Sequence, residues 1–262
     1  MAVINASGAN AVCADILTQA KNEFTLSYNN PALDTTALSP TVYSRSYVGG
    51  LRDWSATVRS RLEPAQIGST AIISNAAGVY NANTKKWSLT IDNNLNDVTA
   101  FNATAPTSRS FANGIMAVSG NYEGFVDDTT ALVAPGPSVN SAVVFRYFDA
   151  ATDHSLTFGL LITGISAPFT PGTAPLAVHS FVASGNLTHA GSGTLTAPLF
   201  PAAMLSSTTV ILPPAASAVF TAASGRTYTG NVLLERMTID VAVDELVTLE
   251  YQLKGTGDLT IA

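Results

Sequence analysis

The residues that most often carry chemistry are few in this chain and share no regular spacing. His154, His179 and His189 do not stand at intervals that would gather imidazoles, alone or with carboxylates, around a metal ion. Cys13 is the only cysteine, which excludes an internal disulfide and a thiolate cluster, and its expected role is that of a small buried hydrophobe. We therefore predict no metal site and no bound cofactor.

Acidic residues offer the strongest candidate for a cation site or a catalytic pair. Glu123 precedes Asp127 and Asp128, and further carboxylates fall within residues 240–250. Such acids could ligate calcium or serve as the two carboxylates of a glycosidase. A solvated loop is the better interpretation, because the acids stand at non-equivalent positions of the internal repeat described next. The sequence also lacks the hydrolase, phosphate-loop and zinc-protease motifs, so we predict no catalytic residues.

The chain repeats itself twice. Residues 24–28 (Phe-Thr-Leu-Ser-Tyr) match residues 87–91 (Trp-Ser-Leu-Thr-Ile), and the match runs on to a glycine in each copy, Gly50 and Gly114. A second repeat pairs residues 165–188 with residues 237–260, closing on Gly-Asn-Leu-Thr and Gly-Asp-Leu-Thr. Self-similarity of this kind decides the architecture of a chain.

The order of the repeats is interleaved rather than tandem. We therefore expect a mainly β protein in which two copies of one β unit share the chain, with few short helices. The second copy is inserted into the first: residues 81–192 form the inserted copy, and residues 1–80 plus 193–262 form the discontinuous outer copy.

The residues that recur are of structural kinds. Asp34 and Asp97 each stand two residues before a threonine, which suits a turn where the carboxylate accepts backbone N–H bonds. Gly50 and Gly114 suit a positive φ angle or a close backbone approach. The recurring aromatic residues are expected to anchor a core or an interface: Phe24, Trp87, Tyr47 and Phe111.

The two arginines of the repeated Ser-Arg-Ser motif, Arg45 and Arg109, leave two interpretations open. They pair with an acid on a neighbouring subunit, or they lie exposed. The glycines that follow, at 49–50 and 114, indicate hairpin turns that bring this segment back into the next strand.

Alternating apolar and polar residues predict strands through most of the chain. The predicted strands include residues 143–148, 156–162, 176–182 and 247–253, and a pair formed by 208–212 and 228–234. Short helices are expected at residues 11–21, 66–77 and 201–205.

Composition favours an assembled protein that does not grip nucleic acid. Only 11% of residues are charged, and the formal net charge is −6, whereas nucleic-acid binding needs clustered Lys and Arg. Few charges with many small polar residues suit subunits that bury their flanks on each other. No apolar run approaches a membrane-spanning length, and the N-terminus lacks the layout of a signal peptide, so we expect no membrane association.

The repeated pattern resembles the tail tube proteins of long-tailed, siphophage-type bacteriophages. The resemblance rests on the Asp-x-Thr loop, the Ser-Arg-Ser-aromatic motif and the run Arg-Asp-Trp-Ser-Ala-Thr-Val at residues 52–58. It rests equally on residues 245–260, which look like the closing strand and terminal Gly-x-Leu-Thr of that family. Both parts occur twice in order, and they cover nearly the whole chain from residue 23.

This resemblance implies two copies of a tail-tube-type β-sandwich or barrel, assembled into stacked rings that form the hollow tail tube for DNA ejection. The loops at residues 31–42 and 95–107 would reach the adjacent ring. Three chains would replace six single-copy subunits as a pseudo-sixfold ring. Implied partners are the tape measure protein in the lumen, the tail terminator and the distal tail or baseplate proteins, with DNA passing unbound. The implied location is the virion tail, assembled in the bacterial host cytoplasm.

Two other classes of function stay open at this point. A β-sandwich adhesin or virion decoration protein that binds a cell surface or a glycan would also suit Thr- and Gly-rich strands. The interleaved order disfavours it, since adhesin modules generally follow one another with linkers. A glycosidase would require a cleft with paired acids, which the non-equivalent acids do not indicate.

Overall fold

The computed structural model describes most of the chain, and all structural statements below concern that part. The described residues are 2–4, 10–13, 15–17, 23–35, 45–61, 73–75, 78–81, 84–100, 108–125, 140–146, 154–168, 175–191, 200–222, 224–243 and 245–262. They are nearly all in strands or short connections, and the single helix among them is one 3-10 turn, η1 (Ala202–Met204). The predicted mainly β class is confirmed.

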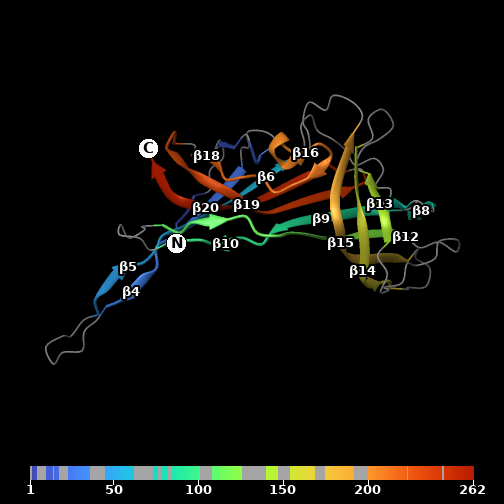
Figure 1. Ribbon diagram of the computed structural model, residues 1–262, viewed down its shortest axis with the longest axis horizontal. Helices are drawn as coiled ribbons and strands as arrows, with labels where there is room; N and C mark the ends of the chain where they lie inside the picture. Colours follow the sequence, from blue (N-terminus) through green and yellow to red (C-terminus); the bar gives the residue numbers. More distant parts are fainter. Residues whose placement is uncertain are drawn as a thin grey trace.

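Two groups of strands lie side by side in one large antiparallel sheet (Figure 1). Unit 1 consists of β2 (Asn10–Val12), β3 (Glu23–Asn29), β6 (Asp53–Arg61), β18 (Ala216–Thr221), β19 (Thr227–Ala242) and β20 (Thr248–Ile261). Unit 2 consists of β7 (Ile73–Asn75), β9 (Thr84–Asn93), β12 (Met116–Phe125), β13 (Asn140–Arg146), β14 (His154–Ser166) and β15 (Leu176–Gly191). Unit 1 is therefore discontinuous, and unit 2 is encoded between its two parts.

The strand pairing of one unit recurs in the other. Unit 1 has the order β3-β6-β20-β19, and unit 2 has the order β9-β12-β15-β14. The β19–β20 pairing is interrupted after Thr229 and after Leu234, and the β14–β15 pairing is interrupted at the counterparts of these positions in the repeat, after Thr157 and after Ile162. A bulge changes the direction in which the following side chains point. Because the bulges fall at equivalent positions, equivalent residues of the two units point to the same side of the sheet.

Each unit closes over an apolar core in the same way. Phe24 of β3 contacts Phe220 of β18, with ring centroids 5.4 Å apart. At the equivalent place in unit 2, Trp87 of β9 contacts Phe145 of β13, with centroids 5.5 Å apart. Phe24 and Trp87 are both buried, so their predicted role as core anchors is confirmed.

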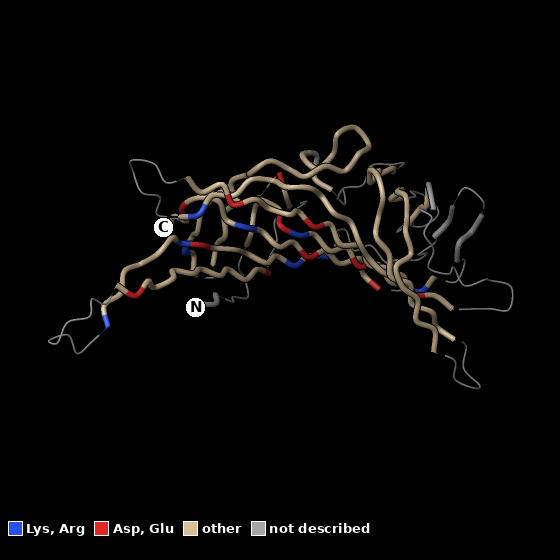
Figure 2. The backbone as a smooth tube through the Cα atoms, turned by 60° about the horizontal axis from the view of Figure 1, so that its bottom comes forward, with Lys and Arg blue, Asp and Glu red and all other residues tan. Residues whose placement is uncertain are grey.

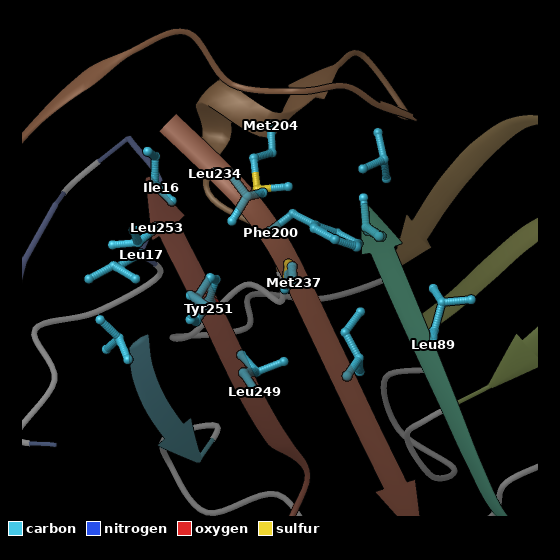
Figure 3. Close-up of a cluster of buried hydrophobic side chains, with 14 of the residues drawn as sticks. Ile16, Leu17, Leu89, Phe200, Met204, Leu234, Met237, Leu249, Tyr251 and Leu253 are labelled. Atoms are coloured by element: carbon cyan, nitrogen blue, oxygen red, sulfur yellow. The ribbon is translucent and has the colours of Figure 1, made fainter. Parts of the chain in front are cut away.

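The cores of the two units merge where β19 pairs with β9 (Figure 3). Leu89 of β9 and Met237 of β19 are fully buried at this junction. Phe200 and Met204, from the segment that returns the chain from unit 2 to unit 1, cover them. The side chains at the junction are therefore as fully buried as those in the core of either unit.

Each unit carries a two-stranded arm that extends its first hairpin. Arm 1 is formed by β4 (Ala32–Asp34) and β5 (Tyr47–Gly49), and arm 2 by β10 (Asn96–Asp97) and β11 (Phe111–Ala112). The predicted hairpin turn at residues 49–50 and 114 is wrong, because β5 pairs with β4 and β6 pairs with β3. The glycines instead mark the bend between unit and arm.

The close backbone approach expected of these two glycines is present. A methyl group on Gly114 would lie 1.5 Å from the carbonyl oxygen of Asn94, and one on Gly50 would lie 3.1 Å from that of Pro31. The bend therefore brings the two strands of the arm into contact at a point where a side chain does not fit.

Several local predictions were wrong because tertiary pairing overrides local pattern. Of the helix predicted at residues 11–21, only 11–13 and 15–17 are described: Ala11 and Val12 belong to β2, which pairs with β18, and a turn occupies residues 15–16. Within 66–77 the described residues include the strand β7. The partner of the 228–234 strand is β18, not residues 208–212. Of the expected helix at 201–205, the single turn η1 is found.

Two short strands at residues 73–81 pair with strands of unit 2. β7 pairs with β13, and β8 (Gly78–Asn81) pairs with β7. Residues 73–81 therefore belong to unit 2, although residues 73–80 were assigned to the outer copy. The remaining short strands are β1 (Ala2–Ile4), which pairs with β3, and the β16 (Leu205–Ser206) and β17 (Thr209–Val210) hairpin, which pairs with β15.

We expect Gly255→Ala to destabilise the fold. A methyl group there would lie 2.0 Å from the Trp54 ring, and this ring is held by its Nε1–H donating to the Gly257 carbonyl at 3.1 Å. Overpacking of this kind costs about 1–3 kcal/mol. Urea unfolding followed by tryptophan fluorescence measures the loss. Gly164→Ala is the matched control, since its methyl would meet only Ser180 Cβ at 3.9 Å, and equal losses in both variants would contradict the assignment.

Candidate assembly surface

One face of the large sheet is mainly polar, with Val182 among its apolar exceptions, and we call it the polar face. Buried residues alternate with polar ones along each strand, as in β9, where Ser88, Thr90 and Asp92 lie opposite Trp87, Leu89 and Ile91. Figure 2 shows acidic and basic residues mixed along these strands. The polar face runs without interruption from unit 1 to unit 2, because β19 and β9 are hydrogen-bonded.

The charges of the polar face neutralise each other across neighbouring strands. Arg59 Nε donates to Glu250 at 2.7 Å, Arg236 Nε to Asp92 at 2.5 Å, and Lys254 Nζ to Asp53 at 2.8 Å. The hydrogen bond from Arg59 lowers the pKa of Glu250 below its usual value. These three cations are held by carboxylates and are not available as a cluster of free positive charge to a phosphate backbone.

The Arg236–Asp92 pair joins unit 1 to unit 2. The ladder beneath it runs from Arg236↔Asp92 to Ala242↔Lys86. Asn93, at the end of this ladder, is buried and satisfied: its Nδ2 donates to the Leu234 carbonyl at 2.8 Å and to Asn113 Oδ1 at 2.8 Å, and its Oδ1 accepts from the Gly114 N–H at 3.0 Å. One side chain thus ties β9, β19 and the base of arm 2 together.

Arm 2 lies against unit 1 of the same chain. The Gly257 N–H donates to the Arg109 carbonyl at 2.9 Å, and the Arg109 N–H donates to the Arg52 carbonyl at 3.0 Å. The Phe111 N–H donates to Thr256 Oγ1 at 3.0 Å. Segment 108–111 therefore fills the space between the start of β6 and the turn in β20.

Side chains complete this contact. Ser108 Oγ donates to the Asp258 carboxylate, and Lys254 Nζ lies 4.9 Å from the centroid of the Phe111 ring. Gly257 has φ +80°, a conformation that favours glycine. Its carbonyl accepts a hydrogen bond from Trp54, while its N–H donates to arm 2. Trp54 therefore holds the turn in place, and the turn binds arm 2.

The repeated arginines pair with the repeated aspartates of their own arms. Arg45 lies 3.9 Å from Asp34, and Arg109 lies 3.7 Å from Asp97. Both arginine side chains are exposed, as one of the two predicted alternatives holds, and each lies near an acid of its own arm. Exposed pairs of this kind contribute about 0–1 kcal/mol.

The predicted aspartate turn is confirmed at Asp97, whose Oδ1 accepts from the Thr99 N–H at 3.0 Å. Hydrogen bonds from Thr99 lower the pKa of Asp97. For Asp34 the corresponding threonine, Thr36, lies outside the described residues.

Arm 1 differs from arm 2 in its surroundings. It projects from the end of the molecule that is remote from unit 2 (Figure 1), and every residue of β4 and β5 is exposed. Three of them are large and apolar: Leu33, Tyr47 and Val48 are 53%, 57% and 51% exposed. An unpacked two-stranded ribbon is marginally stable in water, so arm 1 lacks the support that unit 1 gives to arm 2.

Two strands, β14 and β3, correspond to the two sides of the internal junction, although the sheet continues beyond them to β8 and to β1. In unit 1, Arg236–Ala242 of β19 pair with β9. In unit 2, the matching part of β14 begins at Gly164, and no strand among the described residues pairs with Gly164–Ser166 on the side away from β15. At the other end lies β3, the counterpart of β9, whose Leu26–Tyr28 are paired with the short strand β1.

His179 is the one histidine that the structure buries in an unusual environment. Its ring stacks on Tyr122 with centroids 4.4 Å apart, and neither ring nitrogen has a hydrogen-bond partner among the described residues. Burial lowers the pKa of His179. His189 lies apart from it, with its ring 5.7 Å from Phe200. His179 lies opposite Ile165 of β14 and His189 opposite Leu156, so these two are not gathered into one site, and for His154 only the strand position is described.

The acidic candidates are dispersed in the same way. Glu123 lies on β12 and Glu250 on β20, where Arg59 holds the latter, while Asp127 and Asp128 lie outside the described residues. Within the described part of the chain no group of three or more His, Cys, Asp or Glu is placed to hold a metal ion. Cys13 is buried, and burial raises its pKa to about 11, which confirms its role as a buried hydrophobe.

The docking residues of β20 were not singled out from the sequence. Thr256, Gly257 and Asp258 drew notice only as the end of a repeat, and Asn93 only as one matched position. The usable signal was the glycine of Gly-Asn-Leu-Thr and Gly-Asp-Leu-Thr, which stands at φ +80° in both units, as Gly185 and Gly257.

The chain matches no model of a known protein family. A search of curated proteins likewise finds no match. Among the described residues, no helix has the length and apolar character needed to span a membrane.

We expect protonation of His179 to destabilise the fold in mild acid. Its pKa is lowered in the folded state from the ordinary value of about 6.5, so the unfolded chain binds the proton more readily. The contribution of neutral His179 to the free energy of unfolding is complete above pH 6.5. It is lost as pH falls below that value, by at most about 1.4 kcal/mol per pH unit. Urea unfolding between pH 8 and pH 5 measures this slope. His179→Leu should flatten it, and an unchanged slope would contradict the prediction.

Proposed function

We propose that this protein is a structural virion protein that assembles into stacked rings, forming the hollow tail tube of a long-tailed phage. The observation that carries the proposal is the sheet itself. It continues from one unit to the next through β19 and β9. The strands β14 and β3 correspond to the two sides of that junction. Among the described residues, Gly164–Ser166 of β14 has no partner on the side away from β15, and β1 covers Leu26–Tyr28 of β3. Edges of this kind are templates for pairing with another chain.

The edges predict a head-to-tail contact between chains. If β14 of one chain pairs with β3 of the next, as β19 pairs with β9 inside the chain, the sheet and its polar face continue from chain to chain. Such a heterologous contact forms a closed ring or an open filament. Three chains would close a pseudo-sixfold ring, since each contributes two similar units.

The polar face suits the lumen of such a tube. Its opposite side is buried in the core, and three of its cations, Arg59, Arg236 and Lys254, are engaged by neighbouring carboxylates. DNA would slide along this face without being gripped. On this proposal the lumen holds the tape measure protein before ejection, the tube ends contact the tail terminator and distal tail proteins, and the chain has no enzymatic role.

Electron microscopy of the purified protein, combined with its mass in solution, tests the proposal. Hollow tubes or threefold rings are the expected assemblies, and the tail-tip proteins are added if the protein alone stays monomeric. A chain that remains monomeric with those proteins present, or that binds a glycan or a cell surface instead, would overturn the proposal and favour an adhesin.

Removal of residues 2–9 should promote assembly. β1 pairs with Leu26–Tyr28, the counterparts of Leu89–Ile91, which pair with β19 at the internal junction. An incoming β14 therefore competes with β1 for the same edge. Sedimentation velocity over a concentration series measures the effect, with a lower threshold expected for the shortened chain. An unchanged or raised threshold would show that β1 does not obstruct this edge.

A further inference from the structure

The contact between arm 2 and unit 1 has a vacant counterpart elsewhere in the molecule. Arm 2 docks through residues 108–111 on the β20 turn at residues 256–258. The repeat places residues 44–47 of arm 1 opposite 108–111, and residues 184–186 of β15 opposite 256–258. The chain therefore contains a second arm and a second turn that do not meet each other.

The second turn has the geometry of the first. Gly185 and Gly257 both have φ +80°. A methyl group on either glycine would meet no atom within 4 Å, so in both cases the backbone conformation, and not crowding, favours glycine. The pairings that flank the turns also correspond, with Ser184 opposite Gly159 and Thr256 opposite Asn231.

Exposure distinguishes the occupied turn from the open one. Thr256 and Gly257 are half-buried beneath arm 2, whereas their counterparts Ser184 and Gly185 are exposed; Asp258 and its counterpart Asn186 are both exposed. The same contrast holds for the arms, because Phe111 is half-buried and its counterpart Tyr47 is 57% exposed. Arm 1 and the second turn therefore expose surface that arm 2 and the first turn bury against each other.

The chemistry of the open pair is complementary. At the occupied contact, Lys254 lies against the Phe111 ring. The counterpart of Lys254 is Val182, which is 38% exposed, so Tyr47 would meet an apolar side chain rather than a cation. Ser184 keeps the hydroxyl that Thr256 offers to the arm. Asn186 replaces Asp258 and keeps a side-chain oxygen that can accept from a serine hydroxyl.

We propose that arm 1 of one chain docks on the Ser184–Asn186 turn of a neighbouring copy of the same chain, as arm 2 docks on unit 1 within the chain. The Gly185 N–H would donate to the Arg45 carbonyl, the Tyr47 N–H to Ser184 Oγ, and the Tyr47 ring would pack on Val182. This inference rests on the proposed assembly and names the surfaces that would meet in it.

The contact must form between chains because of where its halves lie. Arm 1 extends from the end of the molecule remote from β14 and β15 (Figure 1). Each chain then offers one free arm at one end and one free turn at the other. Because β3 leads into arm 1 and β14 pairs with β15, the arm contact and the edge pairing would join the same two chains and reinforce each other.

Cross-linking between introduced cysteines tests this contact. Tyr47→Cys and Ser184→Cys are made in separate chains, mixed under assembling conditions, and treated with a short bis-maleimide. A heterodimer that needs both variants is the expected product. The endogenous Cys13 is buried, and its raised pKa of about 11 leaves it in the thiol form, so the wild-type chain should give no product.

The chain supplies its own geometric control. Phe111→Cys with Thr256→Cys, placed together in one chain, stand at the equivalent intrachain contact, where the Phe111 N–H reaches Thr256 Oγ1 at 3.0 Å. That pair should give a cross-linked monomer whether or not assembly occurs. A second measurement uses Tyr47→Ala and Tyr47→Phe without cross-linker. We expect the alanine variant to raise the concentration needed for assembly at least tenfold and the phenylalanine variant to resemble wild type.

The outcomes separate this contact from the proposed function. Absence of any ring or tube by microscopy, with tail-tip proteins present, would refute the assembly itself. Rings or tubes that form normally with Tyr47→Ala, and that give no 47–184 heterodimer while the 111–256 control reacts, would overturn the docking proposal and leave the tube intact.

Discussion

The rest of the structure depends on the pairing of β19 with β9. This ladder joins β19, from the second part of the discontinuous unit 1, to β9 of the inserted unit 2. It buries Leu89 and Met237, orders Asn93 and places Arg236 beside Asp92. The buried apolar contacts outweigh the exposed ion pair energetically, since the former contribute about 25 cal/mol per Å² of buried surface and the latter about 0–1 kcal/mol. Without this ladder the polar face would not be continuous.

The two units share their strand register but differ in residues at their contacts. Arg236 has Gly164 as its counterpart, and Trp54 has Val118. Trp54 lies on Gly255 and holds the β20 turn that binds arm 2. The large ring therefore supports the arm contact that is made within the chain. The counterpart turn in unit 2 has no such anchor, which fits a contact that forms only when another chain arrives.

Sequence patterns predicted the strands and the repeats well where a residue's role was local. Alternation identified β15 and β20, and Asp97 makes the turn expected of it. Predictions failed where a distant partner decided the outcome. Residues 11–21 have helical spacing, yet Ala11 lies opposite Phe220 in a ladder. Residues 208–212 resemble a strand, yet β18 is the partner of β19 because its alternate residues fit the core.

The sequence by itself determined the β class, the interleaved repeats and the absence of motifs for known catalytic chemistry, because alternation and self-similarity are properties of neighbouring residues and of order along the chain. Only the tertiary structure decided that the glycines mark bends rather than hairpin turns. It also decided that the arginines pair within their arms, and that arm 2 is docked while arm 1 is not. Those outcomes depend on which strands lie side by side, and loop closure across long stretches of chain leaves no periodic trace in the sequence.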